Sequence, residues 1–284
     1  MSNTTRPLVH FGHANGFPSG SYGAFFKALG DDIDVISIPK LGHNPRYAIA
    51  PNWHGLGDEL ADSVRAQANG RPVIAVGHSL GGMCSLIAAH RDPTLFQGMI
   101  LMDPACVSPL AGVFVAFMKA IRQVDRITPA GRSKNRRAQW PNAQAMHDSL
   151  RTKGLFKAFS DESFKLYVEH GLVADGDGVR LAFDPKREVE MFRNTPSDSW
   201  RYWRPLNMPR VVMTGAESEF LSSGEMAKLA KAQRVPLEIT AGNHMFPLEQ
   251  PEHTAARVRE HILAMHAGTH ASMPRSINTG SQAK

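Results

Sequence analysis

The chain has 284 residues, of which 42% are hydrophobic and 20% charged, and its net charge is +6. These proportions are typical of a globular protein and exclude a disordered, collagen-like or coiled-coil chain. The longest apolar run, residues 110–118, is much shorter than the roughly 20 residues of a membrane-spanning helix, so we expect no membrane span.

Two further features concern the cellular compartment. Residues 1–7 are mostly polar and lack the basic and then apolar pattern of a secretory signal, so we expect no export by that route. Cys84 and Cys106 are the two cysteines of the chain, too few for a disulfide scaffold. The sequence therefore favours a reducing compartment and a cytoplasmic location.

The positive charge is concentrated in one segment. Residues 119–157 contain ten basic and two acidic side chains. A solvated helical face is the interpretation that we favour, because most charge runs are no more than that. Attraction for an anionic substrate group or an acidic surface is the alternative. Because the run lacks interleaved aromatic residues and a binding motif, we do not expect nucleic acid as a partner.

Apolar strands and helices alternate along most of the chain. Short apolar runs predict strands at residues 8–11, 33–38, 73–76, 99–102, 211–213 and 237–239. Helical spacing or small residues predict helices at residues 52–68, 80–89 and 252–266. Continuous apolar strands that alternate with helices predict an α/β fold with a mostly parallel central sheet and helices on both faces.

This alternation stops between residues 105 and 204, where the sequence predicts helices and gives no strand signal. Five apolar residues there have the spacing of one helical face: Phe114, Phe117, Met118, Ile121 and Val124. Such a face would suit an apolar substrate group, although most faces of this kind simply pack in a core. From residue 268 onwards the composition is small and polar, and we expect a disordered tail over residues 268–284.

The strongest local motif is Gly77-His78-Ser79-Leu80-Gly81, which matches G-x-S-x-G between a predicted strand and a predicted helix. Glycines on both sides allow a tight turn that exposes the serine hydroxyl. The amide N–H groups at the start of the following helix point to the same place. We predict that Ser79 is a nucleophile; the alternative is a tight turn with a structural serine.

At this point the sequence resembles the α/β-hydrolase superfamily, from near its start to about residue 266. Residues 13–18 (HANGFP) resemble the oxyanion loop of that superfamily, residues 77–82 (GHSLGG) its nucleophile elbow, and residues 243–249 (NHMFPLE) its histidine loop. The resemblance implies a hydrolase core formed by residues 1–104 and 205–267. Residues 105–204 occupy the place where the superfamily inserts a cap domain over the active site, here a helical one.

The expected chain order is nucleophile, acid, histidine. His244 follows a predicted strand and lies in a Gly-Asn turn, so it is the best candidate for the base that activates Ser79. Related sequences that read Gly-x-x-Ser-Asp near this strand favour Glu219 as the acid. Glu217 is a close rival, and Asp103, at the end of an earlier strand, is a third candidate.

These roles predict acyl transfer through an acyl-enzyme, with the backbone N–H groups of Leu80 and Asn15 as oxyanion donors and Phe17 as the next candidate. We expect His13 and His78 to brace loops through local hydrogen bonds. Ester hydrolysis is the favoured reaction, whereas thioester, lactone, amide or C–C substrates stay open. A non-catalytic ligand binder and an acyltransferase with the same residues are the alternatives.

The sequence predicts neither a metal site nor a cofactor, because no motif has zinc spacing and the expected acyl transfer requires none. The expected partner is a small-molecule substrate. The oligomeric state stays open, with a homodimer as one option.

Overall fold

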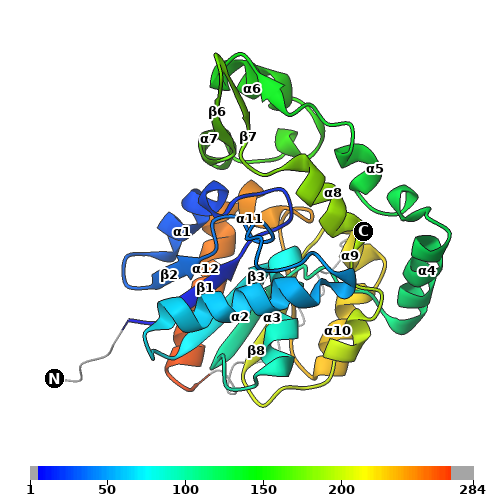
Figure 1. The fold of residues 1–284 in the computed structure, drawn as a ribbon. Helices are drawn as coiled ribbons and strands as arrows, with labels where there is room; N and C mark the ends of the chain where they lie inside the picture. Colours follow the sequence, from blue (N-terminus) through cyan, green and yellow to red (C-terminus); the bar gives the residue numbers. More distant parts are fainter. Residues whose placement is uncertain (1–5, 270–284) are drawn as a thin grey trace, which may run out of the picture.

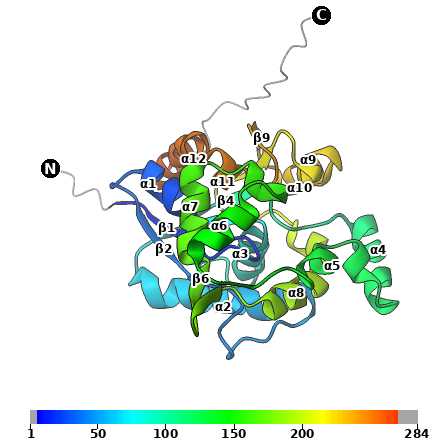
Figure 2. The ribbon, with the colours of Figure 1, turned by 90° about the horizontal axis from the view of Figure 1, so that it is seen from above.

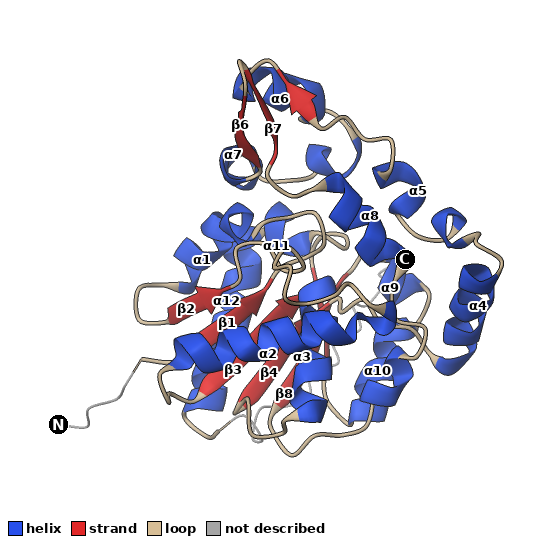
Figure 3. Ribbon diagram, in the orientation of Figure 1, coloured by secondary structure: helices blue, strands red, loops and turns tan. Residues whose placement is uncertain are grey.

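A parallel sheet forms the centre of the protein, whose computed structural model describes residues 6–269. The strand order is β2-β1-β3-β4-β8-β9, and every neighbouring pair is parallel. All six strands lie where the apolar runs predict them. Figure 3 labels β2, β1, β3, β4 and β8 of this sheet. The strands are β1 (Leu8–Gly12), β2 (Asp34–Ser37), β3 (Val73–His78), β4 (Gly98–Met102), β8 (Arg210–Gly215) and β9 (Leu237–Thr240).

Helices cover both faces of this sheet, as the alternating pattern predicts (Figure 1). Helices α2, α3 and α10 pack with one apolar cluster, and α1 and α12 with the other. These helices are α1 (Gly23–Leu29), α2 (His54–Ala68), α3 (Leu80–Arg91), α10 (Glu225–Gln233) and α12 (Pro251–His266). Shorter helical segments are η1 (Ser19–Tyr22), η2 (Pro51–Trp53), α9 (Glu219–Ser222) and α11 (Phe246–Glu249).

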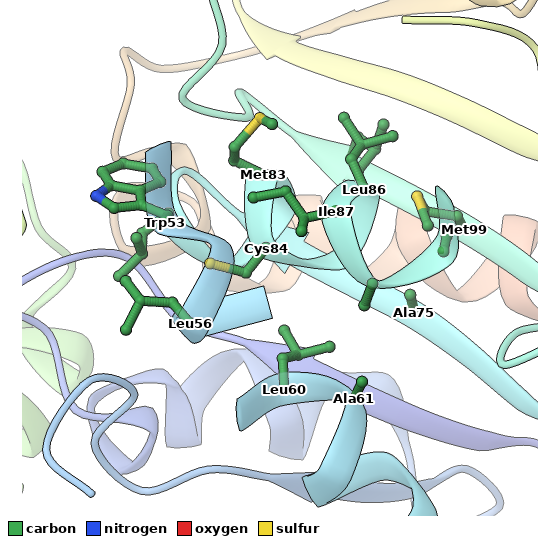
Figure 4. Packing of buried hydrophobic residues seen from close by; sticks show 14 of the residues in the cluster. Trp53, Leu56, Leu60, Ala61, Ala75, Met83, Cys84, Leu86, Ile87 and Met99 are labelled. Atoms are coloured by element: carbon green, nitrogen blue, oxygen red, sulfur yellow. The ribbon is translucent and has the colours of Figure 1, made fainter. Parts of the chain in front are cut away.

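Strand β3 has apolar residues on both faces, which explains its unbroken apolar run. Val73 and Ala75 belong to the cluster beside α2 and α3, whereas Ile74 and Val76 belong to the cluster beside α1 and α12. Side chains of a strand alternate between its two faces, so a strand buried on both faces must be apolar at every position. Figure 4 shows the first cluster, where Leu56 and Leu60 of α2 lie near side chains of α3.

Residues between β4 and β8 form a separate lobe above the carboxyl end of the sheet (Figure 1). It contains a three-stranded antiparallel sheet with the order β5-β7-β6, so the prediction of helices alone was wrong. A loop of two residues at Gly176 joins β6 to β7, and the positive φ of Gly176, +56°, suits glycine. The lobe consists of α4 (Pro109–Ala120), η3 (Val124–Arg126), α5 (Ala130–Ser133), β5 (Gln139–Trp140), α6 (Ala143–Leu150), η4 (Gly154–Lys157), α7 (Asp161–His170), β6 (Leu172–Asp175), β7 (Gly178–Leu181), α8 (Pro185–Arg193) and η5 (Ser199–Tyr202).

The apolar residues near α4 do not form the single packed helical face that the sequence suggests. The helix ends at Ala120, and Val124 belongs to the following 3-10 helix. Phe114, Phe117 and Ile121 are exposed to solvent. Helical spacing identifies residues that share a face, but it does not say what the face contacts.

Several hydrogen bonds fasten this lobe to the core. The Asn15 side chain donates to the Glu188 carbonyl at 3.0 Å, and the Trp53 indole donates to the Met191 carbonyl at 2.9 Å. The Ser160 amide donates to the Leu248 carbonyl at 3.0 Å, close to the loop that follows β9. These bonds place the lobe against both the loop after β1 and the predicted histidine loop.

Three predictions concern the remaining features. Cys84 and Cys106 are free and buried, so the described chain has no disulfide scaffold. No helix among residues 6–269 is long and apolar enough to cross a membrane. The predicted disordered tail lies outside the described residues from residue 270 onwards.

Candidate active site

Ser79 lies on a sharp turn between β3 and α3, as G-x-S-x-G requires. Its φ of +52° and ψ of −113° are unusual for a residue with a side chain. Its amide donates to the Met102 carbonyl at the end of β4 at 3.0 Å, which fixes the turn beside that strand. The half-buried side chain stands at the carboxyl end of the sheet, where ligands of such sheets bind.

Two glycines of the elbow are required by close contacts between backbones. A Cβ atom on Gly81 would lie 2.1 Å from the Gly12 carbonyl carbon, and one on Gly77 would lie 2.6 Å from the Gly82 Cα atom. Both distances are below any real Cβ contact, and the neighbouring atoms belong to backbone that cannot move aside. The glycines therefore allow β1 and α3 to approach at the point where Ser79 is presented.

His244 lies between Ser79 and Asp103. Its Nε2 atom is 3.1 Å from the Ser79 hydroxyl oxygen, and its Nδ1 atom is 3.3 Å from Oδ2 of Asp103. A carboxylate can only accept, so Nδ1–H donates to Asp103 and leaves the Nε2 lone pair for the serine hydroxyl proton. Asp103 is fully buried, and its other oxygen has no hydrogen-bond partner among the described residues. The three side chains form one continuous chain of hydrogen bonds.

Among the described residues, Glu219 does not contact His244. This corrects the prediction of Glu219 as the acid beside the imidazole, a place that Asp103 occupies. Glu219 and its rival Glu217 are both exposed, and neither carboxylate is hydrogen-bonded or ion-paired with the imidazole. Glu219 begins the short helix α9, whereas Asp103 directly follows β4 and its amide donates to the Met213 carbonyl of β8 at 2.9 Å. The end of β4 thus brings a carboxylate to the imidazole.

The amides proposed as oxyanion donors differ in their availability. Among the described residues, the N–H groups of Leu80 and Asn15 have no acceptor, whereas the Phe17 amide donates to the Ala14 carbonyl at 3.2 Å. The Gly81 amide donates to the His13 carbonyl at 3.1 Å, which ties the loop after β1 to the start of α3. The geometry therefore favours Leu80 and Asn15 over Phe17.

His78 connects the two loops that flank Ser79. Its Nε2–H donates to the His244 carbonyl at 2.8 Å, so its Nδ1 atom accepts from the Tyr22 hydroxyl at 2.7 Å. The same hydroxyl oxygen accepts from the Ala14 amide at 3.2 Å. Burial holds the pKa of His78 well below its usual value, so the ring is neutral and the direction of each bond is fixed. We call these residues, Ala14, Tyr22 and His78, the His78 strut.

His13 braces its own loop in the same way. Its Nδ1–H donates to the Ala14 carbonyl at 2.8 Å, and its Nε2 atom accepts from the Leu41 amide at 2.7 Å. Burial lowers the pKa of His13 to about 4, which keeps the ring uncharged. The prediction that His13 and His78 brace loops is confirmed, but the hydrogen bonds of His78 are not local, because its partners Tyr22 and His244 are distant in the sequence. Tyr22 was not predicted, because it ends the short segment Ser19-Gly20-Ser21-Tyr22, which matches no motif.

Among residues 6–269, no three His, Cys, Asp or Glu side chains are grouped as a metal ion would need. The site described so far is a serine on a strained turn, a histidine within reach of its hydroxyl, a buried carboxylate, and two amides without acceptors. Residues 8–258 match the model of a family described as the alpha/beta hydrolase family. The chain belongs to this family.

This alpha/beta hydrolase is similar over most of its length to 2-(acetamidomethylene)succinate hydrolase of Mesorhizobium japonicum. The two are 22% identical over 264 residues, which cover 90% of this chain and 88% of that protein. A solved structure of E-2-(acetamidomethylene)succinate hydrolase has a TM-score of 0.73 at 22% identity and covers 91% of this chain and 92% of its own. At this identity the likeness establishes the fold.

A shorter match is found with the abhydrolase domain-containing protein AKT2 of Alternaria alternata. It is 28% identical over 115 residues, 40% of this chain, and it spans only 39% of AKT2.

Proposed function

We propose that this alpha/beta hydrolase cleaves the carboxylic ester of a small, partly apolar molecule through an acyl-enzyme. Ser79 acts as nucleophile, His244 as general base and then general acid, and Asp103 as the acid that orients the imidazole. The observation that carries the proposal is the continuous hydrogen-bonded chain from Asp103 through His244 to Ser79, with distances of 3.3 and 3.1 Å. This is the arrangement that activates a serine whose free hydroxyl is otherwise unreactive.

In the first half of the reaction, the Ser79 oxygen attacks the ester carbonyl carbon while its proton passes to Nε2 of His244. The negative charge on the former carbonyl oxygen is stabilised by the N–H groups of Leu80 and Asn15. Loss of one such donor typically costs about 3 to 4 kcal/mol of transition-state energy. The bond to the leaving alcohol then breaks, and His244 gives its proton to the departing oxygen.

In the second half, a water molecule attacks the acyl-enzyme and transfers a proton to Nε2 of the same histidine. The second tetrahedral intermediate breaks its bond to the Ser79 oxygen, which takes the proton back, and the carboxylic acid leaves. Throughout both halves, the buried Asp103 carboxylate holds the imidazole tautomer and stabilises the imidazolium.

The partly apolar character of the substrate is supported by Phe220, a half-buried residue whose ring centre lies 5.0 Å from that of His244. The lobe above the carboxyl end of the sheet would serve as the cap that covers this substrate.

A second property of the substrate, an anionic group, stays a prediction of the sequence. Three cations of the basic segment are already paired: Lys134 with Asp125, Arg136 with Glu188, and Arg151 with Asp161. We expect added salt to lower kcat/KM more for a carboxylate-bearing ester than for its neutral analogue. An equal response of the two esters would remove the anionic group from the proposal.

The test combines labelling by a fluorophosphonate with turnover of p-nitrophenyl esters. We expect Ser79→Ala to abolish labelling and to lower kcat by at least about 10⁴-fold. The matched control is Ser85→Ala on α3, the helix that follows Ser79. Within residues 6–269 the Ser85 hydroxyl donates only to the Gly81 carbonyl, at 2.8 Å, so this variant should keep its turnover.

The substrates tested should include an amide, because the relative that matches most of the chain is named 2-(acetamidomethylene)succinate hydrolase. They should also include a thioester, which the sequence leaves open. Absence of turnover and labelling in the wild type would favour the non-catalytic binder. Transfer of the acyl group to an added alcohol in preference to water would favour an acyltransferase.

A further inference from the structure

The solvent-facing side of α4 is entirely apolar. Leu110, Val113, Phe114, Phe117 and Ile121 are between 46% and 83% exposed. Their spacing of three, four and seven residues places them on one side of the helix. Ile121 is the first residue after α4 and continues this side. We call these five residues the α4 face. Single exposed apolar residues are common, whereas a contiguous group marks an interaction site.

The α4 helix is held with this face outward by contacts on its opposite side. At its start, the Ser108 hydroxyl donates to the Glu225 carboxylate at 3.0 Å. At its end, the Lys119 ammonium group donates to the Thr195 carbonyl. Between them, Gly112 packs so closely on the Ser197 carbonyl that a Cβ atom there would lie 2.2 Å from its oxygen. The α4 face is therefore a fixed surface, and Figures 1 and 2 both place α4 at the outer edge of the molecule.

Three arginines without an acidic partner among the described residues follow the α4 face in the sequence. Arg122, Arg126 and Arg132 are exposed, and none of the three side chains forms a hydrogen bond or ion pair within residues 6–269. The only acidic residue between positions 109 and 137 is Asp125. Its carboxylate is already occupied by two hydrogen bonds from Arg193, at 2.8 and 2.7 Å.

We propose that the α4 face docks on an anionic lipid surface, with its apolar side chains in the headgroup region and the three arginines against lipid phosphates and carboxylates. An apolar helical face with cations beside it is the pattern that binds at such an interface. Each basic residue near an anionic bilayer contributes favourably, within reach of its surface potential.

A second copy of the chain fits this surface less well. A two-fold contact brings the same patch together from both copies, so it would place the unpaired arginines of one copy near those of the other. The five side chains of the α4 face are also far fewer than the about 20 to 30 residues that each side of a stable interface provides.

Sedimentation with vesicles tests this proposal. The probes are vesicles of phosphatidylcholine with about one third phosphatidylserine, and vesicles of phosphatidylcholine alone. We expect the wild type to bind the anionic vesicles, and the double variant Phe114→Ser/Phe117→Ser to lower the partition coefficient by about tenfold or more. We expect Arg122→Gln/Arg126→Gln to lower it by about fivefold per arginine on anionic vesicles only.

The matched control is Ile239→Ser on β9, because Ile239 is 53% exposed, as Phe114 is, but lies outside the α4 face. It should bind vesicles as the wild type does. Failure of the wild type to bind anionic vesicles, or binding unchanged in both double variants, would overturn the proposal. A dimer in analytical ultracentrifugation that Phe114→Ser/Phe117→Ser dissociates would also overturn it and assign the face to a second copy.

The docking proposal is independent of the proposed ester hydrolysis. Both double variants should turn over a soluble p-nitrophenyl ester at the wild-type rate. All four side chains are exposed, and within residues 6–269 none forms a hydrogen bond, ion pair or ring contact with Ser79, His244 or Asp103. Retained turnover also verifies that the variants fold. Loss of lipid binding with retained turnover supports the docking surface, whereas a wild type without turnover affects only the proposed function.

Discussion

The pairing of His244 with Asp103 makes Asp103→Asn the most informative substitution in this protein. The carboxylate is fully buried, and within residues 6–269 its only hydrogen bond from a side chain comes from Nδ1 of His244. An asparagine has nearly the same size but can donate its amide N–H to Nδ1. The imidazole would then carry its proton on Nε2, which faces Ser79 at 3.1 Å, and could no longer accept the hydroxyl proton.

The expected loss in kcat is about 10⁴-fold, or about 5 kcal/mol of transition-state stabilisation. KM should change little, because Asp103 acts through the imidazole and does not touch the substrate. Steady-state turnover of a p-nitrophenyl ester measures both quantities. Near-ultraviolet circular dichroism and a thermal melt verify that the variant keeps its tertiary structure.

Glu219→Gln and Glu217→Gln are the matched controls, since each also replaces a carboxylate by its amide. Both side chains are exposed, and neither contacts the imidazole. We expect each to keep kcat within about twofold of the wild type, as exposed charges contribute little. If Asp103→Asn keeps more than a tenth of the activity while Glu219→Gln loses it, Asp103 does not orient the histidine and the mechanism needs another acid.

Two other substitutions test the frame around the site, and a third tests a paired carboxylate on β9. Tyr22→Phe leaves two buried groups of the His78 strut without partners, the Ala14 amide and Nδ1 of His78. Urea unfolding should therefore give a free energy of unfolding lower by about 2–4 kcal/mol. A change below about 0.5 kcal/mol would mean that water replaces the hydroxyl. Gly81→Ala puts a methyl group 2.1 Å from the Gly12 carbonyl carbon, so fluorophosphonate labelling should be lost and the melting temperature lowered; a labelled, stable variant would show that the backbones can separate. Burial alone would raise the pKa of Glu238. Hydrogen bonds from His261 and Arg257 outweigh the effect of burial and lower this pKa from 4.5 to about 2. The ionised Glu238 therefore stabilises the fold fully above pH 4.5, and this contribution is lost as the pH falls towards about 2. Glu238→Gln should flatten the pH dependence of the free energy of unfolding in this range. An unchanged slope of that free energy against pH would contradict the pairing.

The sequence predicts the four inner strands of the central sheet, β1, β3, β4 and β8, well because they are buried along their whole length. Such strands must be apolar at every position, as residues 73–76 are, so their signal is local and strong. The turn at Ser79 is also recognised from a short motif. Gly77 is required by the neighbouring Gly82, whereas the contact that requires Gly81, with Gly12 of β1, is distant in the sequence.

The identity of the acid depends on contacts that are distant in the sequence. Glu219 and Asp103 both follow strands, and the sequence does not say which strand end approaches His244. In the structure β4 lies between β3 and β8, so the residue after β4 is adjacent to the serine turn. The order of strands in a sheet is a tertiary property, which single-strand patterns do not contain.

The lobe between β4 and β8 was predicted less well for two physical reasons. Its strands β6 and β7 are short and mostly not buried, so they lack an apolar pattern. The segment Asp175-Gly176-Asp177-Gly178 was the available hairpin signal. In α4 the apolar periodicity identifies a helix. The contact that turns the α4 face towards solvent is that of Gly112 with Ser197, which lies in a distant segment of the chain.

The frame of the site depends on two consecutive residues that hold His244 from different sides. Ser79 lies against the imidazole ring, and His78 binds the carbonyl of the same histidine at 2.8 Å. The third contact, from Asp103, comes from the next strand, where His78 and Met102 are register partners. Because β3 and β4 are hydrogen-bonded neighbours, the three groups that locate His244 cannot move far relative to one another. The loop after β9 is therefore positioned by the sheet itself, and a histidine about 165 residues from its serine can be held at hydrogen-bond distance without a long rigid connection between them.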